Sequence, residues 1–143
     1  ILMEGQMRFR VVRFNGHEPF WRAAVELLDD LPELDSALEL LSREVSDLYM
    51  EAYRKGLELT GERAGKLELP ESASDLSFMV SYVLDMDIEE KQRLLTMTSI
   101  RERLSALITY LRHANEQLDQ QIHHRQIVET VRGNGNLGKA EDK

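Results

Sequence analysis

The sequence predicts an α+β protein that is mostly helical, with a β-hairpin followed by a helical bundle that contains two long helices. Between Met7 and Phe14 the apolar residues Met7, Phe9 and Val11 alternate with Arg8 and Arg10, which is the period of a half-buried strand. Apolar residues then recur every three or four positions over 33–60 and 99–132, which is the period of amphipathic helices. Capping residues mark two shorter helices between them. We therefore expect about two-thirds of the chain to be helical.

The hairpin is expected to pair residues 6–14 with residues 18–28. Asn15 and Gly16 are expected to supply the turn, because this dipeptide is typical of tight hairpins. The residues expected on one apolar side are Met7, Phe9, Val11, Trp21, Ala23, Val25 and Leu27. Two strands alone are marginally stable in water, so the hairpin must lean on the helices or lack strands that precede Ile1. An unpaired edge would then attract a partner.

The first long helix is expected to begin just after Pro32, which suits a first helical turn. Glu33 and Asp35 would complement the dipole at that end. The buried stripe would consist of Leu34, Leu38, Leu41, Val45, Leu48 and Ala52. The glycines expected to weaken and end this helix are Gly56, Gly61 and Gly65.

The later helices are predicted from their caps. Ser72 precedes one short helix, and Asp87 precedes another with Glu90 three residues on. Ser99 repeats this pattern at the start of the last helix, which Gly133 is expected to end. The expected inner residues are Leu76, Met79, Val80, Val83 and Leu84, then Leu94 and Leu95, then Ile100, Leu104, Leu107, Leu111, Leu118 and Ile122. We assign 1–30 to terminal strands of a β-domain, 31–133 to the helical bundle and 134–143 to a flexible tail.

Composition and charge exclude several classes of function. The net charge is −8, so a nucleic-acid partner would meet mostly repulsion. Arginine outnumbers glutamate four to two in residues 1–22, whereas acids outnumber bases ten to three in residues 23–60. Without cysteine, the chain has no disulfide, thiolate metal site or cysteine nucleophile. Neither a membrane-spanning run nor a signal sequence is present, so the cytoplasm is the expected location. Ile1 in place of an initiator methionine suggests a processed or excised fragment.

Residues 133–140 read GNGNLGKA, one hydroxyl short of a phosphate-binding loop. Such a loop needs a strand before it and a helix after it, whereas here a helix precedes it and the chain soon ends. Ala140 also cannot bind Mg²⁺. The sequence therefore predicts no nucleotide site and no cofactor.

The histidines and acidic residues also predict no metal site or catalytic triad. His123 and His124 point about 100° apart on a helix, and His113 is too far along it to join them. His17 has no serine or cysteine partner placed by the sequence. The acidic residues Asp29, Asp30, Glu33 and Asp35 lack the spacing of a calcium loop, and a dipole-complementing start of a helix explains them.

Three aromatic residues are the candidate contact surface for extended polypeptide: Phe14, Phe20 and Trp21. Most aromatic residues on alternating strands lie in a core, so burial is the alternative interpretation. The apolar stripes of the helices have a similar alternative, because they could serve self-association as well as the bundle core.

The order of these segments resembles the later part of the N-terminal substrate-binding domain of Lon-type ATP-dependent proteases, or a stand-alone protein of that kind. Matching positions in the hairpin are Gly5, Arg8, Phe9, Pro19, Phe20, Ala24, Val25, Glu26 and Asp30. Matching positions in the helices are Glu90, Lys91, Gln92, Leu94, Leu95, Arg101, Glu102, Arg103 and Leu104. The resemblance covers about residues 5–125. It departs from the family in two ways: the opening β-rich half is missing, and the last helix ends at Gly133 instead of running on toward an ATPase domain.

The resemblance implies that the hairpin is a remnant of a PUA-like β-domain. It also implies a non-catalytic module that binds unfolded, damaged or tagged polypeptide and leaves unfolding and hydrolysis to other domains or proteins. The alternative function is a structural helical module that mediates oligomer assembly. From the net charge of −8 we expect bound segments to be basic and hydrophobic. We expect no ATPase or peptidase activity, no nucleic acid and no membrane among its partners.

Overall fold

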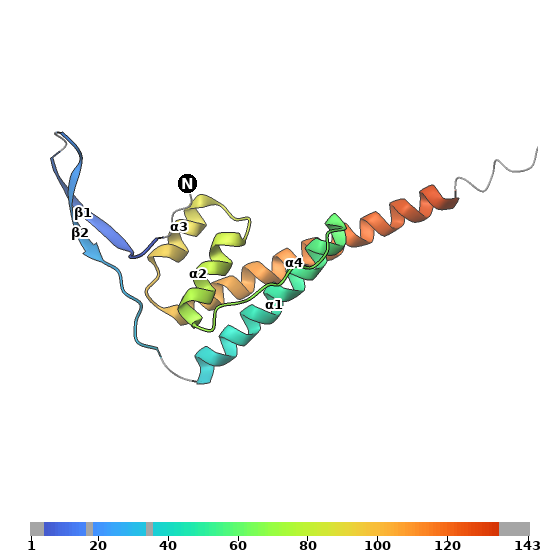
Figure 1. Ribbon diagram of the computed structural model, residues 1–143, viewed down its shortest axis with the longest axis horizontal. Coiled ribbons are helices and arrows are strands. Elements are labelled where there is room, and N and C mark those ends of the chain that lie inside the picture. The colour runs from blue at the N-terminus through green and yellow to red at the C-terminus, as the bar shows by residue number, and fades with distance from the viewer. Residues whose placement is uncertain (1–4, 17–18, 34–35, 135–143) are drawn as a thin grey trace, which may run out of the picture.

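The computed structural model describes residues 5–16, 19–33 and 36–134, and its elements follow the predicted order (Figure 1). The elements are β1 (Phe9–Gly16), β2 (Arg22–Leu27), α1 (Ser36–Thr60), α2 (Ala73–Val83), α3 (Ile88–Thr96) and α4 (Ile100–Asn134). The structure is 63% helical, which confirms the mostly helical α+β class. Both long helices and both short ones are present.

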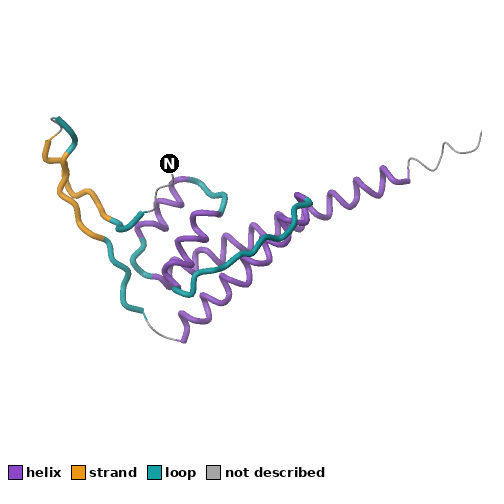
Figure 2. Tube along the Cα trace, viewed as in Figure 1, coloured by secondary structure: helices purple, strands orange, loops and turns teal. Residues whose placement is uncertain are grey.

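The two long helices lie side by side and run in the same direction (Figure 1). Asn115 Nδ2 on α4 donates to the Leu48 carbonyl on α1 at 3.0 Å. Further along both helices, Lys55 Nζ lies 2.8 Å from Asp119 Oδ2. Later residues of α1 thus meet later residues of α4. A parallel pair requires the chain to return to its starting end, and the loop after α1 runs back along the bundle to do so (Figure 2).

The core lies between the long helices and is closed by α2 and α3. Its buried apolar residues are Leu38, Val45, Tyr49, Leu76, Val80, Leu94, Leu104, Leu107, Ile108 and Leu111. Most of the stripe predicted for each long helix therefore faces the core, whereas Ala52, Leu118 and Ile122 are partly buried and lie outside it. Val83 and Leu95 were expected inside, but Val83 is 52% exposed and Leu95 is 44% exposed. Leu94 occupies the core side of the short helix α3, which leaves its neighbour Leu95 facing outward.

Two of the predicted caps are confirmed. Ser72 Oγ accepts a hydrogen bond from the Asp75 amide at 3.3 Å, and Ser99 Oγ accepts one from the Glu102 amide at 3.2 Å. Asp87 stands before α3 as predicted, but its side chain makes no capping hydrogen bond, so the capping box expected there is wrong.

The end of α1 was predicted correctly, whereas its start was predicted only in part. The helix begins at Ser36, and Leu34 and Asp35 lie outside the described residues. Glu33 was expected to complement this end of α1, and in the structure its carboxylate accepts from the Arg101 amide at 2.9 Å at the start of α4. At the other end Gly61 has a φ of 72°, and its amide donates to the Leu57 carbonyl at 2.8 Å. Gly61 therefore ends α1 as predicted.

The hairpin is antiparallel as predicted, but its strands are shorter and its turn lies elsewhere. β1 continues through Asn15 and Gly16, so this dipeptide belongs to the strand and the predicted turn is wrong. The connection spans 17–21, and its residues 17–18, which include His17, lie outside the described ranges.

The far end of the chain differs slightly from the prediction. Helix α4 passes Gly133 and ends at Asn134. The rest of the predicted tail, 135–143, lies outside the described residues and contains most of the GNGNLGKA segment. Within the described ranges, no helix is both long and apolar enough to cross a membrane.

Candidate functional site

The hairpin has one apolar face and one charged face, and a β-bulge keeps them separate. Val11 pairs with Val25 and Arg13 pairs with Ala24, so Val12 is an extra residue in β1. Without this bulge, Arg13 would share a face with Val11. With it, Phe14 pairs with Ala23 and joins the apolar side. The residues of this apolar face are Phe9, Val11, Phe14, Trp21, Ala23, Val25 and Leu27.

The apolar face is open to solvent. Phe14 is 65% exposed and Trp21 is 72% exposed. Their rings touch edge to face with centroids 5.4 Å apart, so the structure brings these two predicted residues together. The expectation that aromatic residues on these strands lie in a core therefore fails for the described residues. Figure 1 shows the reason, because the hairpin projects away from the helices.

Phe20 is exposed as well but has a different neighbour. The Arg22 guanidinium lies over its ring, 5.0 Å from the centroid. Arg22 pairs with Gly16, which places it on the charged side of the hairpin. The three predicted aromatic residues therefore form one pair and one separate arginine-covered ring.

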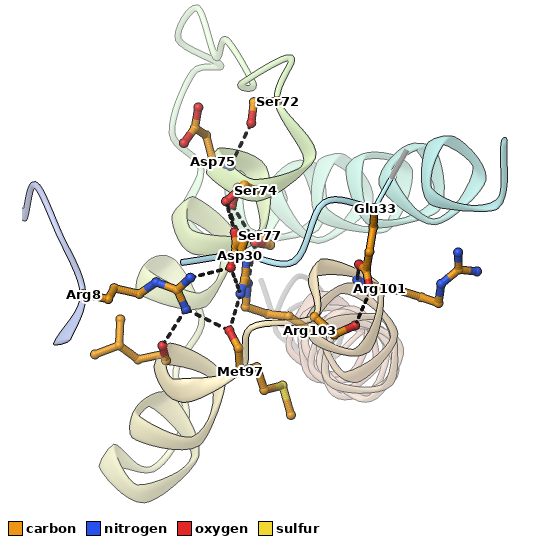
Figure 3. Close-up of polar contacts among 12 residues, drawn as sticks. Arg8, Asp30, Glu33, Ser72, Ser74, Asp75, Ser77, Met97, Arg101 and Arg103 are labelled. Atoms are coloured by element: carbon orange, nitrogen blue, oxygen red, sulfur yellow. Dashed lines mark hydrogen bonds and ion pairs between the residues drawn. The ribbon is translucent and has the colours of Figure 1, made fainter. Parts of the chain in front are cut away.

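A polar cluster around the buried Arg103 side chain anchors both ends of the hairpin to the helices (Figure 3). We call it the arginine joint, and it consists of Arg8, Asp30, Ser74, Ser77 and Arg103. Arg8 immediately precedes β1, and Asp30 follows β2 after a short link. The Arg8 and Asp30 side chains meet where α2 and α4 begin and α3 ends. The two ends of the hairpin are therefore held against the helices.

Arg103 is the centre of the arginine joint and is fully buried. Its Nη2 lies 2.9 Å from Asp30 Oδ2 and its Nη1 lies 3.1 Å from Asp30 Oδ1, which is a bidentate pair. Its Nε donates to Ser77 Oγ at 2.7 Å, and its Nη1 also donates to the Met97 carbonyl at 2.7 Å. A buried guanidinium is tolerated only when its charge and its donors are satisfied in this way.

Arg8 completes the arginine joint from the hairpin side. It forms an ion pair with Asp30 and donates to the carbonyls of Leu95 and Met97 at 2.9 and 2.8 Å. These carbonyls end α3, where a positive charge also complements the helix dipole. The Phe78 ring contacts both guanidinium groups, with centroid distances of 4.8 Å to Arg8 and 4.0 Å to Arg103.

The arginine joint lowers the pKa of Asp30. Burial alone would raise the pKa of this carboxyl group. The hydrogen bonds from Arg103 and Ser74, together with the charges of Arg103 and Arg8, outweigh that effect. Asp30 therefore remains ionised at neutral pH, as its arginine partners require.

The arginine joint was not predicted from the sequence as a unit. Asp30 was expected to complement the dipole at the start of a helix, whereas its carboxylate binds two arginines. The spacing of the last helix did indicate that Arg103 is buried. Arg103 lies three residues after Ile100 and four before Leu107, on the buried stripe. An arginine at such a position requires an acidic partner, but its spacing does not say which one.

Other candidate chemistry finds no support in the described part of the chain. The described residues contain no group of three or more histidine or acidic side chains placed to hold a metal ion. His113 is exposed and contacts Gln117 on its own helix at 2.9 Å. Two surface hollows are each lined by α4 alone, and a single helix cannot enclose a ligand.

Comparison with known proteins supports the resemblance noted above. Residues 1–113 match the family described as the ATP-dependent protease La (LON) substrate-binding domain. Over 120 residues the chain is 28% identical to a Lon protease of Syntrophus aciditrophicus, an alignment that covers 83% of this chain and 15% of that protein.

Two further relatives align with similar identity and with a similar share of each chain. The chain is 27% identical over 129 residues to Lon protease 2 of Herpetosiphon aurantiacus, covering 90% of this chain and 16% of that protein. It is 22% identical over 119 residues to Lon protease 1 of Bacillus subtilis, covering 83% of this chain and 15% of that protein. The chain thus spans less than a fifth of the length of these relatives.

Proposed function

Since this chain belongs to the LON substrate-binding domain family, we propose that it is a non-catalytic module that recognises unfolded, damaged or tagged polypeptide. The observation that carries the proposal is the exposed apolar face of the hairpin, with Phe14 and Trp21 in contact. Large exposed apolar surfaces on globular proteins are typical of interaction sites. Unfolded polypeptide is a fitting ligand because it exposes the apolar side chains that native proteins bury.

The arginine joint supports this role by holding the apolar face in place. A hairpin anchored at both ends loses little freedom when a ligand binds, so less of the contact energy is offset by ordering. Each aromatic side chain buried on contact contributes about 1 to 2 kcal/mol. A few such contacts give binding in the micromolar to millimolar range, on the order expected for transient substrate capture.

Trp21 makes the proposal directly testable, because it is the only tryptophan of the chain. We would titrate a protein without tryptophan, in native and permanently unfolded forms, and follow Trp21 fluorescence. The unfolded form should bind, and the native form should bind at least about tenfold more weakly. Phe14→Ala should weaken binding, whereas Leu40→Ala, at an exposed leucine on α1, should not. Equal binding of the two forms, or no binding at millimolar concentration, would refute the proposal.

Unfolding and hydrolysis of the bound polypeptide belong, in this proposal, to other domains or proteins. The relatives are named Lon proteases, and this chain aligns with only 15% to 16% of their length. We propose that the chain itself has neither ATPase nor peptidase activity, binds no cofactor and acts in the cytoplasm. Turnover of ATP or of a peptide by the pure chain, abolished by Lys139→Ala, would contradict this.

A second candidate function is assembly through α4, and one observation favours it. Arg125 Nη1 donates to the Leu59 carbonyl near the end of α1 at 2.8 Å. Beyond that contact, α4 continues without α1 and carries the exposed side chains of Ile127 and Val131. Sedimentation of wild type and of the Ile127→Glu/Val131→Glu variant tests this function. A concentration-dependent oligomer that the variant abolishes would support it, and a monomer in both would exclude it.

A further inference from the structure

The chain returns from the end of α1 to the start of α2 as an extended segment, residues 62–72, which we call the strap. The strap runs back along the helical bundle, because α1 and α4 are parallel (Figure 2). Residues 62–66 are exposed, whereas Leu67 and Leu69 are partly buried and pack against the apolar core. Connections of this length without secondary structure are uncommon in compact domains and often carry a function.

The strap is held by few contacts. Its side chains alternate as in a strand, since Leu67 and Leu69 face the core while Lys66 and Glu68 are 86% and 73% exposed. No backbone group of residues 63–71 forms a hydrogen bond within the described part of the chain. Apart from the exposed ion pair between Lys66 and Glu68, the burial of side chains is therefore what holds the strap on the bundle.

We propose that the strap is an autoinhibitory occupant of a second polypeptide-binding site, which lies on the helical bundle. An unfolded polypeptide with two apolar side chains two residues apart displaces the strap and places those side chains where Leu67 and Leu69 lie. The inference rests on the proposed function, that unfolded polypeptide is the ligand, and adds to it a site that does not involve the hairpin.

The strap itself shows which ligand the site accepts. It is an extended polypeptide that contacts the core through two leucine side chains and forms no backbone hydrogen bond between residues 63 and 71 of the described chain. Such a site does not select the residue between the two apolar side chains, because Glu68 at that position is mostly exposed. Unfolded polypeptide meets these requirements, since it exposes apolar side chains that a native protein buries.

The tether of the strap sets how strongly it competes with a free ligand. A segment linked to its site by a short flexible connection acts at an effective concentration on the order of millimolar. The small exposed residues Ala64 and Gly65 leave the start of the strap without a side-chain anchor. The site is therefore open for a fraction of the time, and the apparent affinity of a free ligand is reduced by that fraction. Removing the two leucines of the strap should recover the lost affinity.

The test uses the 143-residue chain, a fluorescent peptide with the sequence of residues 63–71, and the same peptide with serine in place of both leucines. By fluorescence anisotropy, the leucine peptide should bind Leu67→Ser/Leu69→Ser about tenfold more tightly than the wild type, because the variant no longer fills the site. The serine peptide should bind neither chain. The matched control is Lys66→Ser/Glu68→Ser, which removes exposed side chains of the same strap and keeps the net charge. This control should bind the leucine peptide like the wild type.

A second measurement needs no substitution in the strap. Methyl NMR of the wild-type chain follows Leu67 and Leu69 while unfolded protein is added. Their signals should move toward the positions of solvent-exposed leucine, whereas those of Leu40, which is already exposed on α1, should stay in place. Circular dichroism checks the fold of each variant, and the NMR result decides if Leu67→Ser/Leu69→Ser does not fold.

Three outcomes count against the strap as an autoinhibitory occupant. Equal affinity of the leucine peptide for the wild type and for a folded Leu67→Ser/Leu69→Ser variant would overturn this role. Binding of unfolded protein that leaves the Leu67 and Leu69 signals unchanged would overturn it as well, and would leave the proposed function standing on the apolar face of the hairpin. If unfolded protein binds neither the wild type nor the variant, both proposals fail.

Discussion

Arg103 and Asp30 form a bidentate ion pair across 73 residues of sequence, with nitrogen–oxygen distances of 2.9 and 3.1 Å. The arginine side chain is fully buried, and that of the aspartate is 16% exposed. This pair connects the end of the hairpin to the last helix. The position of the proposed binding surface therefore depends on the polar contacts of the arginine joint, which include those of Arg8, rather than on apolar packing of the hairpin, whose apolar face is exposed.

Asp30→Ala should lower the free energy of unfolding by about 3 kcal/mol, because it leaves the buried Arg103 charge without its carboxylate. Asp29→Ala is the matched control, since Asp29 is the exposed neighbour in sequence. It should change the free energy of unfolding by less than about 0.5 kcal/mol. Urea denaturation at neutral pH measures both values. Equal small effects would show that Arg8 and Arg103 do not depend on Asp30.

Acid should weaken the arginine joint through Asp30. Its pKa in the folded chain is lowered, since the arginine and serine contacts outweigh the effect of burial, whereas an unfolded aspartate has a pKa of about 3.9. Protons therefore bind the unfolded chain more readily. The stabilisation is fully present well above pH 4 and is lost as the pH falls through the folded pKa. Urea denaturation from neutral pH down to about pH 2 should show a smaller acid-dependent loss in Asp30→Ala than in the wild type.

Glu33→Ala should lower the free energy of unfolding by about 1 kcal/mol, because α4 loses an anion at its first turn. Glu33 accepts from the Arg101 amide at 2.9 Å and from Ser99 Oγ at 2.8 Å. Glu62→Ala, at an exposed acid in the loop after α1, is the control and should have little effect. Chemical denaturation measures both. A Glu33→Ala value no larger than that of the control would contradict this capping role.

Gly56→Ala and Gly61→Ala should change stability in opposite directions. Gly56 lies within α1, and a methyl group there meets nothing within 4 Å, so alanine should stabilise by about 0.5 to 1 kcal/mol. Gly61 has a φ of 72°, which alanine adopts at a cost of about 1 kcal/mol. Both substitutions restrict the unfolded chain alike, so the difference between their melting temperatures reports the native backbone. Changes of the same sign would show that Gly61 need not end α1.

Most of the fold could be predicted because its signals are local. The stripe through Leu104, Leu107 and Leu111 faces the core as its spacing required. Ser72 and Ser99 cap helices because each bonds an amide only three residues away. Asp87 shows the limit of this reasoning, since it occupies a capping position without making the bond. Glu90, the other half of that expected capping box, accepts from Tyr110 at 2.6 Å instead.

The candidate site was predicted less completely. Phe14 and Trp21 were named as a candidate contact surface with burial in a core as the alternative, and the structure exposes both and places them in contact. Phe20 was grouped with them, but the Arg22 guanidinium lies over its ring. The face on which a strand residue lies depends on every bulge before it. The adjacent residues Val11 and Val12 interrupt the alternation of apolar and arginine side chains, but the interruption alone does not show that the strand bulges there.

The sequence by itself determined the order and type of the elements and the apolar sides of the long helices, because these follow from contacts within a few residues. Only the tertiary structure decided which charged residues meet. Asp30 binds Arg8 and Arg103, and Glu33 serves α4 rather than α1, because the parallel packing of α1 and α4 brings distant segments to one end of the bundle. An acidic residue carries the same charge wherever it lies, so its partner depends on distance in space.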